Sequence, residues 1–303
     1  MMKKNTVILI LAVILGLSLI LRFYNLSQPP MTCVDEFYYA PAANAFATGQ
    51  LDPNLTHHPP LAKEIIGLSV KLLGNYPLGW RIFPVFFSLG GLLITFLLSQ
   101  EIFKKLGQKL MTGKQPPSTS SPQPSTNRIA NLLALLTTFL VAFDFLYFTL
   151  SRTGMLDIFM TFFLLLTVFF VWRYLASPSR SGALFIGLAL GATLAAKWAG
   201  GLLLLLFPFI IIGYQNGRQP KNPPDNSPRS FFSSLWGHLI LITVGAVVIY
   251  VLSYLPYLAH HNLFELVKLQ GSILFRGMFT SNKPLQGSGS LNSLLWLYIR
   301  RSL

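Results

Sequence analysis

The chain has 303 residues, of which 52% are apolar and only 11% are charged. A soluble domain of this length needs polar faces on its elements, and the sequence shows no such alternation, so a soluble globular fold is excluded. The formal charge of +14 is compatible with nucleic-acid binding, but the placement of the 23 Lys and Arg residues argues for membrane topology instead. The composition therefore predicts an all-α polytopic membrane protein.

Seven apolar segments are candidate membrane crossings, since a crossing helix needs about 20 apolar residues. We expect these helices over residues 6–24, 79–99, 129–149, 155–175, 182–196, 200–213 and 235–258. With a cytoplasmic amino terminus, seven crossings satisfy the positive-inside rule. The basic residues placed on the cytoplasmic side are Lys3, Lys4, Lys104, Lys105, Lys109, Lys114, Arg128, Arg173, Arg180, Arg218, Lys221 and Arg229.

Two parts of this topology have a second interpretation. The stretch 182–213 could be one long helix, but a lone Lys197 near its centre would cost about 2.5–3.5 kcal/mol on insertion scales. We therefore expect two short helices that turn near the outer surface at Lys197. The first apolar segment could instead be a cleaved signal with a site near residues 43–45, and an acidic motif at Asp35 would then be lost.

The segments between the crossings differ in character. Residues 107–127 and 214–230 are rich in Pro, Ser, Gln and Asn, and we expect them to be disordered cytoplasmic loops. The long outer loop, residues 25–78, contains an apolar stripe that predicts a helix on the membrane surface. The stripe consists of Leu61, Ile65, Leu68 and Leu72, flanked by Ala62, Ile66, Ser69 and Leu73, with Lys63, Glu64, Gly67 and Lys71 off it.

The chain divides into a transmembrane region, residues 1–260, and an outer amphipathic segment, residues 261–303. The second part contains an amphipathic stretch over 263–279, for which Asn262 is the expected N-cap.

The acidic pair Asp35 and Glu36 directly follows the first helix. A carboxylate there can face a water-filled cavity while a lipid-borne substrate approaches along the bilayer, so a general base is a candidate role. The alternative is a solvated acidic turn at a helix exit.

Further charges lie at the outer ends of helices: Arg81, Asp144, Arg152, Asp157 and Lys197. Charges at the membrane boundary are functional candidates, and the basic ones would suit a phosphate leaving group. In the structural alternative, Arg152 pairs with Asp157, Arg81 extends toward the lipid head groups, and Lys197 anchors its helix at the interface.

Metal binding is not expected. His57 and His58 precede two prolines and are more typical of a turn than of a ligand set, with one carboxylate pair at hand. Cys33 is the only cysteine, which excludes an intramolecular disulfide and a thiolate metal cluster.

Five short motifs occur in order along the chain: DEFYYAP at 35–41, HPPLAKE at 58–64, GWRIFP at 79–84, SRTGMLD at 151–157 and GLALGATLAAKWAG at 187–200. Together they resemble the protein O-mannosyltransferase family, especially its bacterial members. Order and spacing also match, over about residues 20–260, although any one motif alone would be a weak signal.

The resemblance implies a GT-C-like transmembrane bundle. By the same resemblance, Asp35 would be the general base and Glu36 would position donor or acceptor. Arg81 would contact the sugar phosphate. The surface helix that flanks the donor would be shaped by His58, Pro59, Pro60 and Lys63. The residues expected to line the site or support it are Arg152, Asp157 and Lys197.

The implied reaction is transfer of mannose from a polyprenyl-phosphate donor to Ser or Thr hydroxyls of secreted or membrane proteins. Inversion at the sugar is expected, with no cofactor and no metal. The expected partners are membrane lipid, the lipid-linked sugar and a polypeptide acceptor, together with the secretion machinery; nucleic acid is not expected. The expected location is the plasma membrane, with the active site exoplasmic.

The chain departs from the family pattern near its end. Family members continue with several more helices, whereas residues 269–303 keep Gln270 but lack the expected His and Pro/Trp-rich loop. The soluble carbohydrate-recognition domains of eukaryotic relatives are also absent. We therefore expect a fragment. The alternatives are a related glycosyltransferase that acts on a lipid or glycan, an inactive truncated partner subunit, or a transporter-like bundle.

Overall fold

The computed structural model describes residues 4–53, 55, 58–112, 124–206 and 228–279, and every regular element within these ranges is helical. Contacts divide the chain into two units, Met1–Ala259 and His260–Leu303. The second unit contains α12 (Leu263–Phe279). Asn262 caps this helix as expected, because its Oδ1 accepts a hydrogen bond from the backbone N–H of Glu265 at 2.9 Å.

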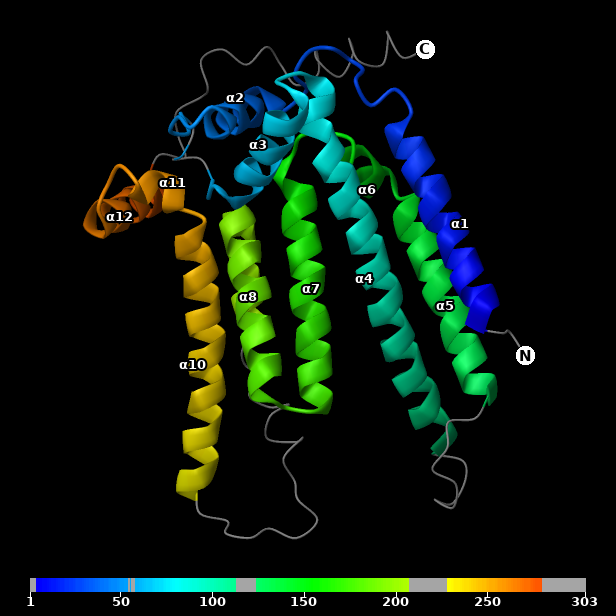
Figure 1. Ribbon diagram of the computed structural model, residues 1–303. Helices are drawn as coiled ribbons and strands as arrows, with labels where there is room; N and C mark the ends of the chain where they lie inside the picture. Colours follow the sequence, from blue (N-terminus) through cyan, green and yellow to red (C-terminus); the bar gives the residue numbers. More distant parts are fainter. Residues whose placement is uncertain (1–3, 54, 56–57, 113–123, 207–227, 280–303) are drawn as a thin grey trace. The chain divides into compact units, whose positions relative to one another are not determined.

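Apolar helices form the body of the first unit (Figure 1). Four of those described are long and apolar enough to cross a membrane: α1 (Lys4–Phe23), α4 (Pro77–Thr112), α7 (Leu156–Ala176) and α10 (Pro228–Leu252). The shorter apolar helices are α5 (Pro124–Ala142) and α8 (Arg180–Ala196). The prediction of an all-α polytopic membrane protein is confirmed.

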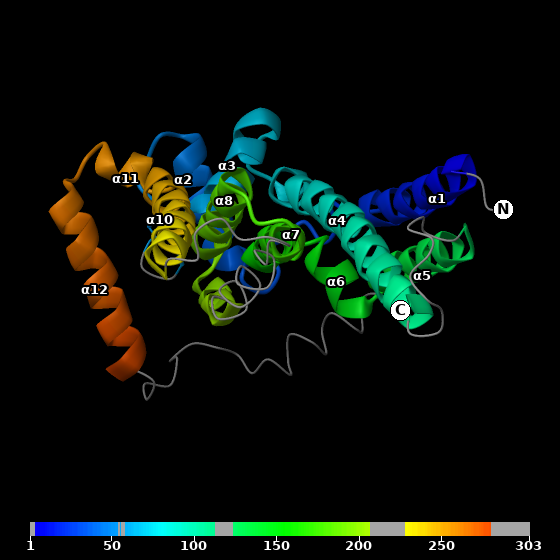
Figure 2. The same cartoon turned by 90° about the horizontal axis from the view of Figure 1, so that it is seen from below.

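The helices of the first unit form two neighbouring groups (Figures 1 and 2). α1, α4 and α5 pack together, α8 packs between α7 and α10, and α4 contacts α7. One end of these helices carries α2 (Glu36–Ala47) and α3 (Leu61–Leu73) (Figure 1). The predicted acidic pair therefore lies where several helix ends meet.

The chain between α8 and α10 must connect opposite ends of the bundle. α8 ends beside α2 and α3, whereas α10 begins at the other end and finishes near the short helix α11 (Leu255–Leu258) (Figure 1). The connection starts with the 3-10 helix η1 (Trp198–Leu206). The remainder of the predicted crossing 200–213 lies outside the described residues.

Three predicted segments have other boundaries in the structure. The expected helix 129–149 is broken, because Asp144 adopts an extended backbone and its Oδ1 accepts a hydrogen bond from the Tyr147 N–H at 2.8 Å. This N-cap starts a separate helix, α6 (Phe145–Leu150). The described parts of the expected loops 107–127 and 214–230 are helical, since α4 continues to Thr112 and α10 begins at Pro228.

The helix expected at 61–73 is confirmed as α3, while its place on the membrane surface stays a prediction. Leu68 and Leu72 of the apolar stripe are 47% and 67% exposed, whereas Lys63 and Gly67, off the stripe, are buried against the protein. Small size explains the burial of Gly67, since a Cβ there would lie 2.8 Å from the carbonyl oxygen of Ala43 in α2. Close approach of α2 therefore selects the face of α3 that is covered.

Arg22, which the sequence did not single out, joins α1 to α5 and α6. Its side chain is fully buried, and Nη2 donates to the Ala142 carbonyl at 3.0 Å. Nη1 bonds to Ser18, one turn earlier in α1. The guanidinium also lies 4.9 Å from the ring centre of Phe148, a cation–π contact.

Glycines allow α8 and α10 to approach closely. A Cβ on Gly187 would lie 2.4 Å from the Ile242 carbonyl oxygen, and one on Gly191 would lie 2.5 Å from that of Ala246. The residue numbers rise together, so the two helices run parallel. Small residues at such contacts stabilise helix pairs in membranes, where no hydrophobic force acts between helices.

Gly191→Val should force α8 and α10 apart and lower stability by roughly 1–3 kcal/mol, the usual penalty for overpacking. Gly237→Ala is the matched control on α10, because a Cβ there meets nothing within 4 Å. Thermal unfolding of the purified protein in detergent measures both. An equal melting temperature for Gly191→Val and wild type would contradict this contact.

Candidate active site

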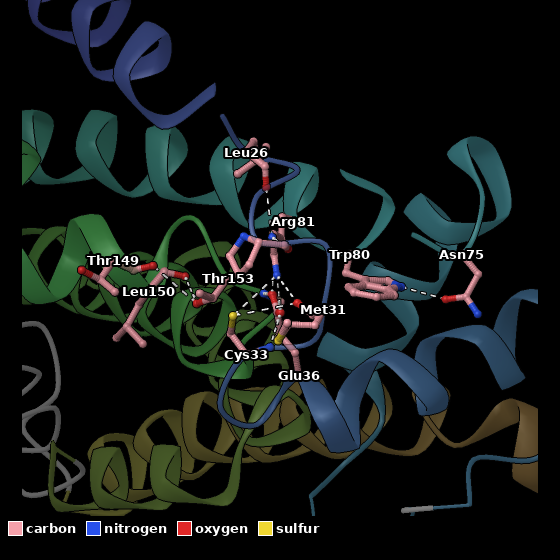
Figure 3. A network of polar contacts seen from close by, with 12 residues as sticks. Leu26, Met31, Cys33, Glu36, Asn75, Trp80, Arg81, Thr149, Leu150 and Thr153 are labelled. Carbon is pink, nitrogen blue, oxygen red and sulfur yellow. Dashed lines mark hydrogen bonds and ion pairs between the residues drawn. The ribbon is translucent and has the colours of Figure 1, made fainter. Parts of the chain in front are cut away.

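A buried ion pair between Glu36 and Arg81 organises the end of the bundle that carries α2 and α3 (Figure 3). Glu36 is 0% exposed and Arg81 is 1% exposed. Oε1 of Glu36 accepts from Nε of Arg81 at 2.8 Å, and Oε2 accepts from Nη2 at 2.7 Å. This two-point geometry is the strongest form of such a pair.

The Glu36 carboxylate also accepts two backbone hydrogen bonds. The Gly154 N–H donates to Oε1 at 2.7 Å, and the Cys33 N–H donates to Oε2 at 2.8 Å. Gly154 belongs to the segment between α6 and α7, and Cys33 to the segment between α1 and α2. Glu36 therefore ties together parts of the chain that are far apart in sequence.

Arg81 directs its remaining N–H groups to the segment between α1 and α2. Nη1 donates to the carbonyls of Leu26 at 3.2 Å and Pro29 at 3.0 Å, and Nη2 donates to that of Met31 at 3.0 Å (Figure 3). All five N–H groups thus face protein acceptors. This favours a positioning role for both members of the pair, while donor contact by Arg81 or Glu36 stays a prediction.

The side chain of Asp35 has a different environment from that of Glu36. Asp35 is half-buried and occupies the N-cap of α2 without a side-chain capping bond, and its carboxylate makes no hydrogen bond or ion pair with the described residues. Val34, just before it, has φ +50°, a left-handed conformation that a β-branched residue rarely adopts. The backbone is thus turned so that Glu36 points inward while the Asp35 carboxylate stays available.

Asp157 and Lys197 form the second polar contact of the site. Lys197 Nζ lies 2.7 Å from Asp157 Oδ1, with exposed fractions of 18% and 25%. Asp157 begins α7 and Lys197 ends α8, so the pair bridges two helix ends. The alternative pairing of Asp157 with Arg152 was wrong. A lysine at this position is accessible to a ligand in a way that buried Arg81 is not.

Tyr39 lies near both Asp35 and Asp157, although it was not among the predicted site residues. Burial, together with the negative charges of Asp35 and Asp157, raises the pKa of Tyr39. Tyr39 therefore lies within electrostatic reach of both carboxylates. A signal was present in the sequence, because Tyr39 follows Asp35 by four residues, one helical turn.

Arg152 and His58 lie around this centre. Nη2 of Arg152 donates to the Tyr24 carbonyl at 2.5 Å, and its guanidinium lies 5.6 Å from the Phe148 ring centre. His58 lies with its ring centre 6.2 Å from that of Tyr39. Donor binding by Arg152 and His58 stays a prediction, and His57 lies outside the described residues.

Lys63 is only 2% exposed and forms an ion pair with Asp52. Burial lowers the pKa of Lys63, and the opposing charge of Asp52 only partly restores it. Lys63, Asp52 and Glu64 all line a pocket of about 30 Å³, which is large enough for a water molecule. Burial raises the pKa of Glu64 to about 8. Contact of Lys63 with a lipid-linked donor stays a prediction, and it would require Asp52 to move away from Lys63.

Within the described ranges, no group of three or more His, Cys, Asp or Glu side chains could hold a metal ion. The expectation of a metal-free site stays a prediction.

Glu36→Gln removes the charge that balances Arg81. Because a buried charge without its partner is strongly unfavourable, we expect a loss of about 3–5 kcal/mol in unfolding free energy. Denaturant unfolding in detergent measures it. The control is Glu101→Gln, which removes an exposed pair with Arg173 at 4.0 Å and should change stability by less than about 1 kcal/mol. Equal losses in the two variants would argue against the buried pair.

The raised pKa of Glu64 makes the free energy of unfolding depend on pH in a defined direction. The folded chain keeps this proton up to about pH 8, whereas the unfolded chain releases it near pH 4.5. The contribution of Glu64 to stability should therefore be greatest below pH 4.5 and be lost as the pH rises to 8. Glu64→Gln should match wild type near pH 4.5 and exceed its melting temperature at pH 8. Glu101→Gln should leave the slope unchanged, and an unaltered slope in Glu64→Gln would refute the assignment.

Comparisons with known proteins support the family and the fold. The family model for dolichyl-phosphate-mannose-protein mannosyltransferase matches residues 12–102 and 128–261. Dolichyl-phosphate-mannose–protein mannosyltransferase 1 of Candida albicans is 24% identical over 309 residues, 90% of this chain and 30% of the relative. Polyprenol-phosphate-mannose–protein mannosyltransferase of Corynebacterium glutamicum is 31% identical over 167 residues, 50% of this chain and 27% of the relative.

A solved structure is also similar, that of the S. cerevisiae protein O-mannosyltransferase Pmt1-Pmt2 complex bound to the sugar donor. Its TM-score is 0.62 at 18% identity, with 86% of this chain and 34% of that chain covered, which supports the predicted bundle fold. The chain spans less than a third of the length of the curated relatives named above. Because the family model covers well over half of its residues, the chain belongs to the dolichyl-phosphate-mannose-protein mannosyltransferase family.

Proposed function

We propose that the protein to which this chain belongs transfers mannose from a polyprenyl-phosphate donor to Ser or Thr hydroxyls of polypeptides. The relatives are named as mannosyltransferases that use dolichyl- or polyprenol-phosphate mannose and act on protein, which supports the donor and acceptor classes. The single observation that carries the proposal is the Asp35 carboxylate, which has no partner among the described residues although it adjoins a fully satisfied buried pair. A carboxylate left unpaired beside a rigid support is suited to accept a proton.

The reaction needs one base and one cation. Asp35 takes the proton of the acceptor hydroxyl as its oxygen bonds to C1 of mannose, while the bond from C1 to the phosphate oxygen breaks with its electron pair leaving on phosphate. Attack opposite to the phosphate inverts C1. Lys197, held by Asp157 at 2.7 Å, is the accessible cation that would neutralise the leaving phosphate. Such a scheme uses no metal or other cofactor.

The Glu36–Arg81 pair supports this chemistry indirectly. It fixes the segment before Asp35 through the carbonyls of Leu26, Pro29 and Met31, so the base is held in place before the substrate arrives. Preorganised groups stabilise a transition state without further rearrangement.

The membrane setting follows from the charge distribution. We place the amino terminus in the cytoplasm, because basic residues then lie inside, and the site on the exoplasmic face of the plasma membrane. A secreted polypeptide would reach it there, in association with the secretion machinery. An enzyme that acts on a glycan or a lipid, or an inactive partner subunit, would have the same fold. The assay of mannose transfer to peptide distinguishes these alternatives.

Asp35→Asn should reduce mannose transfer by about 100-fold or more, because it removes the base and keeps the size of the side chain. Membranes containing the chain are given labelled polyprenyl-phosphate mannose and a Ser/Thr-rich peptide. Asp144→Asn is the control, since Asn caps a helix as well as Asp and should leave transfer intact.

Full activity in Asp35→Asn would reject Asp35 as the base. Transfer to lipid or glycan but not to peptide would favour the related glycosyltransferase. If only a longer protein with the downstream coding region is active, the same comparison of Asp35→Asn with Asp144→Asn is made in that protein.

A further inference from the structure

Tyr39 is a buried side chain between the two charged parts of the site. It is 4% exposed and lies one helical turn after Asp35 in α2, where its N–H donates to the Asp35 carbonyl at 3.1 Å. It belongs to the same buried apolar cluster as Leu156 and Ala196. Those residues directly precede Asp157 and Lys197, so the ring is packed where the second ion pair begins.

The Tyr39 hydroxyl makes no hydrogen bond with the described residues. It is also not one of the fully enclosed polar atoms without a partner, so the ring is buried while the hydroxyl oxygen is reached by solvent. Two other tyrosines are engaged inside the protein: the Tyr147 hydroxyl donates to the Ser88 carbonyl at 2.7 Å, and the Tyr174 hydroxyl lies 2.7 Å from His238 Nδ1. The Tyr39 hydroxyl is therefore held in place by its buried ring and free to bond to a ligand that displaces water.

The surroundings of Tyr39 determine what its hydroxyl can offer. Burial and the charges of Asp35 and Asp157 raise its pKa, so the phenol keeps its proton at neutral pH and acts as a donor. The hydroxyl can therefore donate its proton to an acceptor oxygen of a ligand. Asp35 faces the acceptor hydroxyl in the proposed reaction and Lys197 faces the phosphate, which leaves the sugar between them.

We propose that the Tyr39 hydroxyl donates a hydrogen bond to a hydroxyl oxygen of the transferred hexose. This inference rests on the proposed function and adds a residue that recognises the sugar. A neutral donor suits a neutral hydroxyl, while the anionic phosphate is left to the lysine. The same contact would hold C1 in line between the incoming oxygen and the departing phosphate.

The test compares binding of two ligands, a short-chain polyprenyl-phosphate mannose and the matching polyprenyl phosphate without sugar. Tyr39→Phe removes only the hydroxyl and no internal hydrogen bond, so its melting temperature should equal that of wild type. Its affinity for the sugar-bearing ligand should fall about threefold to tenfold, the loss of one neutral hydrogen bond. Its affinity for the sugar-free ligand should not change.

Tyr147→Phe is the matched control. It loses an internal hydrogen bond, so it should melt at a lower temperature and keep the wild-type ratio of the two affinities. Once binding is established, deoxy-mannose donors identify the hydroxyl: Tyr39→Phe should make no difference with the analogue that lacks it.

The outcomes separate this inference from the function on which it depends. Equal affinities of Tyr39→Phe and wild type for the mannose ligand would overturn the sugar contact. An equal loss for both ligands would overturn it as well and place the hydroxyl at the phosphate or lipid. Failure of the wild-type chain to bind the mannose ligand at all would count against the proposed donor, and with it against this role of Tyr39.

Discussion

Burial of the Glu36–Arg81 pair is the constraint on which the rest of this end of the molecule depends. Removing two charges from water is expensive, and mutual attraction offsets this only when the remaining donors and acceptors are also satisfied. The pair meets that condition through Gly154, Cys33 and a row of carbonyls between α1 and α2. The folded pair therefore fixes two segments outside the regular helices, one between α1 and α2 and one between α6 and α7.

The groups to which we assign the chemistry are arranged around this fixed point. Asp35 is adjacent to Glu36 in sequence, yet the left-handed backbone at Val34 allows one carboxylate to be enclosed and the other to remain available. Asp157 and Lys197 reach the site from helix ends on the other group of helices. Rigid support on one side and an accessible ion pair on the other is the arrangement that the proposed transfer from an anionic lipid-linked donor would use.

The membrane-spanning helices that support this site are held together by close contacts rather than by the hydrophobic effect. Gly187 and Gly191 let α8 approach α10, and Arg22 joins α1 to α5 through the Ala142 carbonyl. In lipid such contacts must rely on shape and on hydrogen bonds, because apolar side chains gain little by leaving lipid for protein. The position of α8, and so of Lys197 at its end, depends on the contact with α10.

The sequence by itself determined the membrane class, most helix positions, the cap at Asn262 and the family, because apolar length, capping residues and motif order are local properties. It also selected Asp35, Arg81, Asp157 and Lys197 as a group. Only the tertiary structure decided that Glu36 is enclosed by Arg81, that Asp157 pairs with Lys197, and that Lys63 and Gly67 face inward. Tyr39 and Arg22 emerged only there as well. Partners of a charge and the buried face of a short helix depend on segments distant in sequence, which no local pattern specifies.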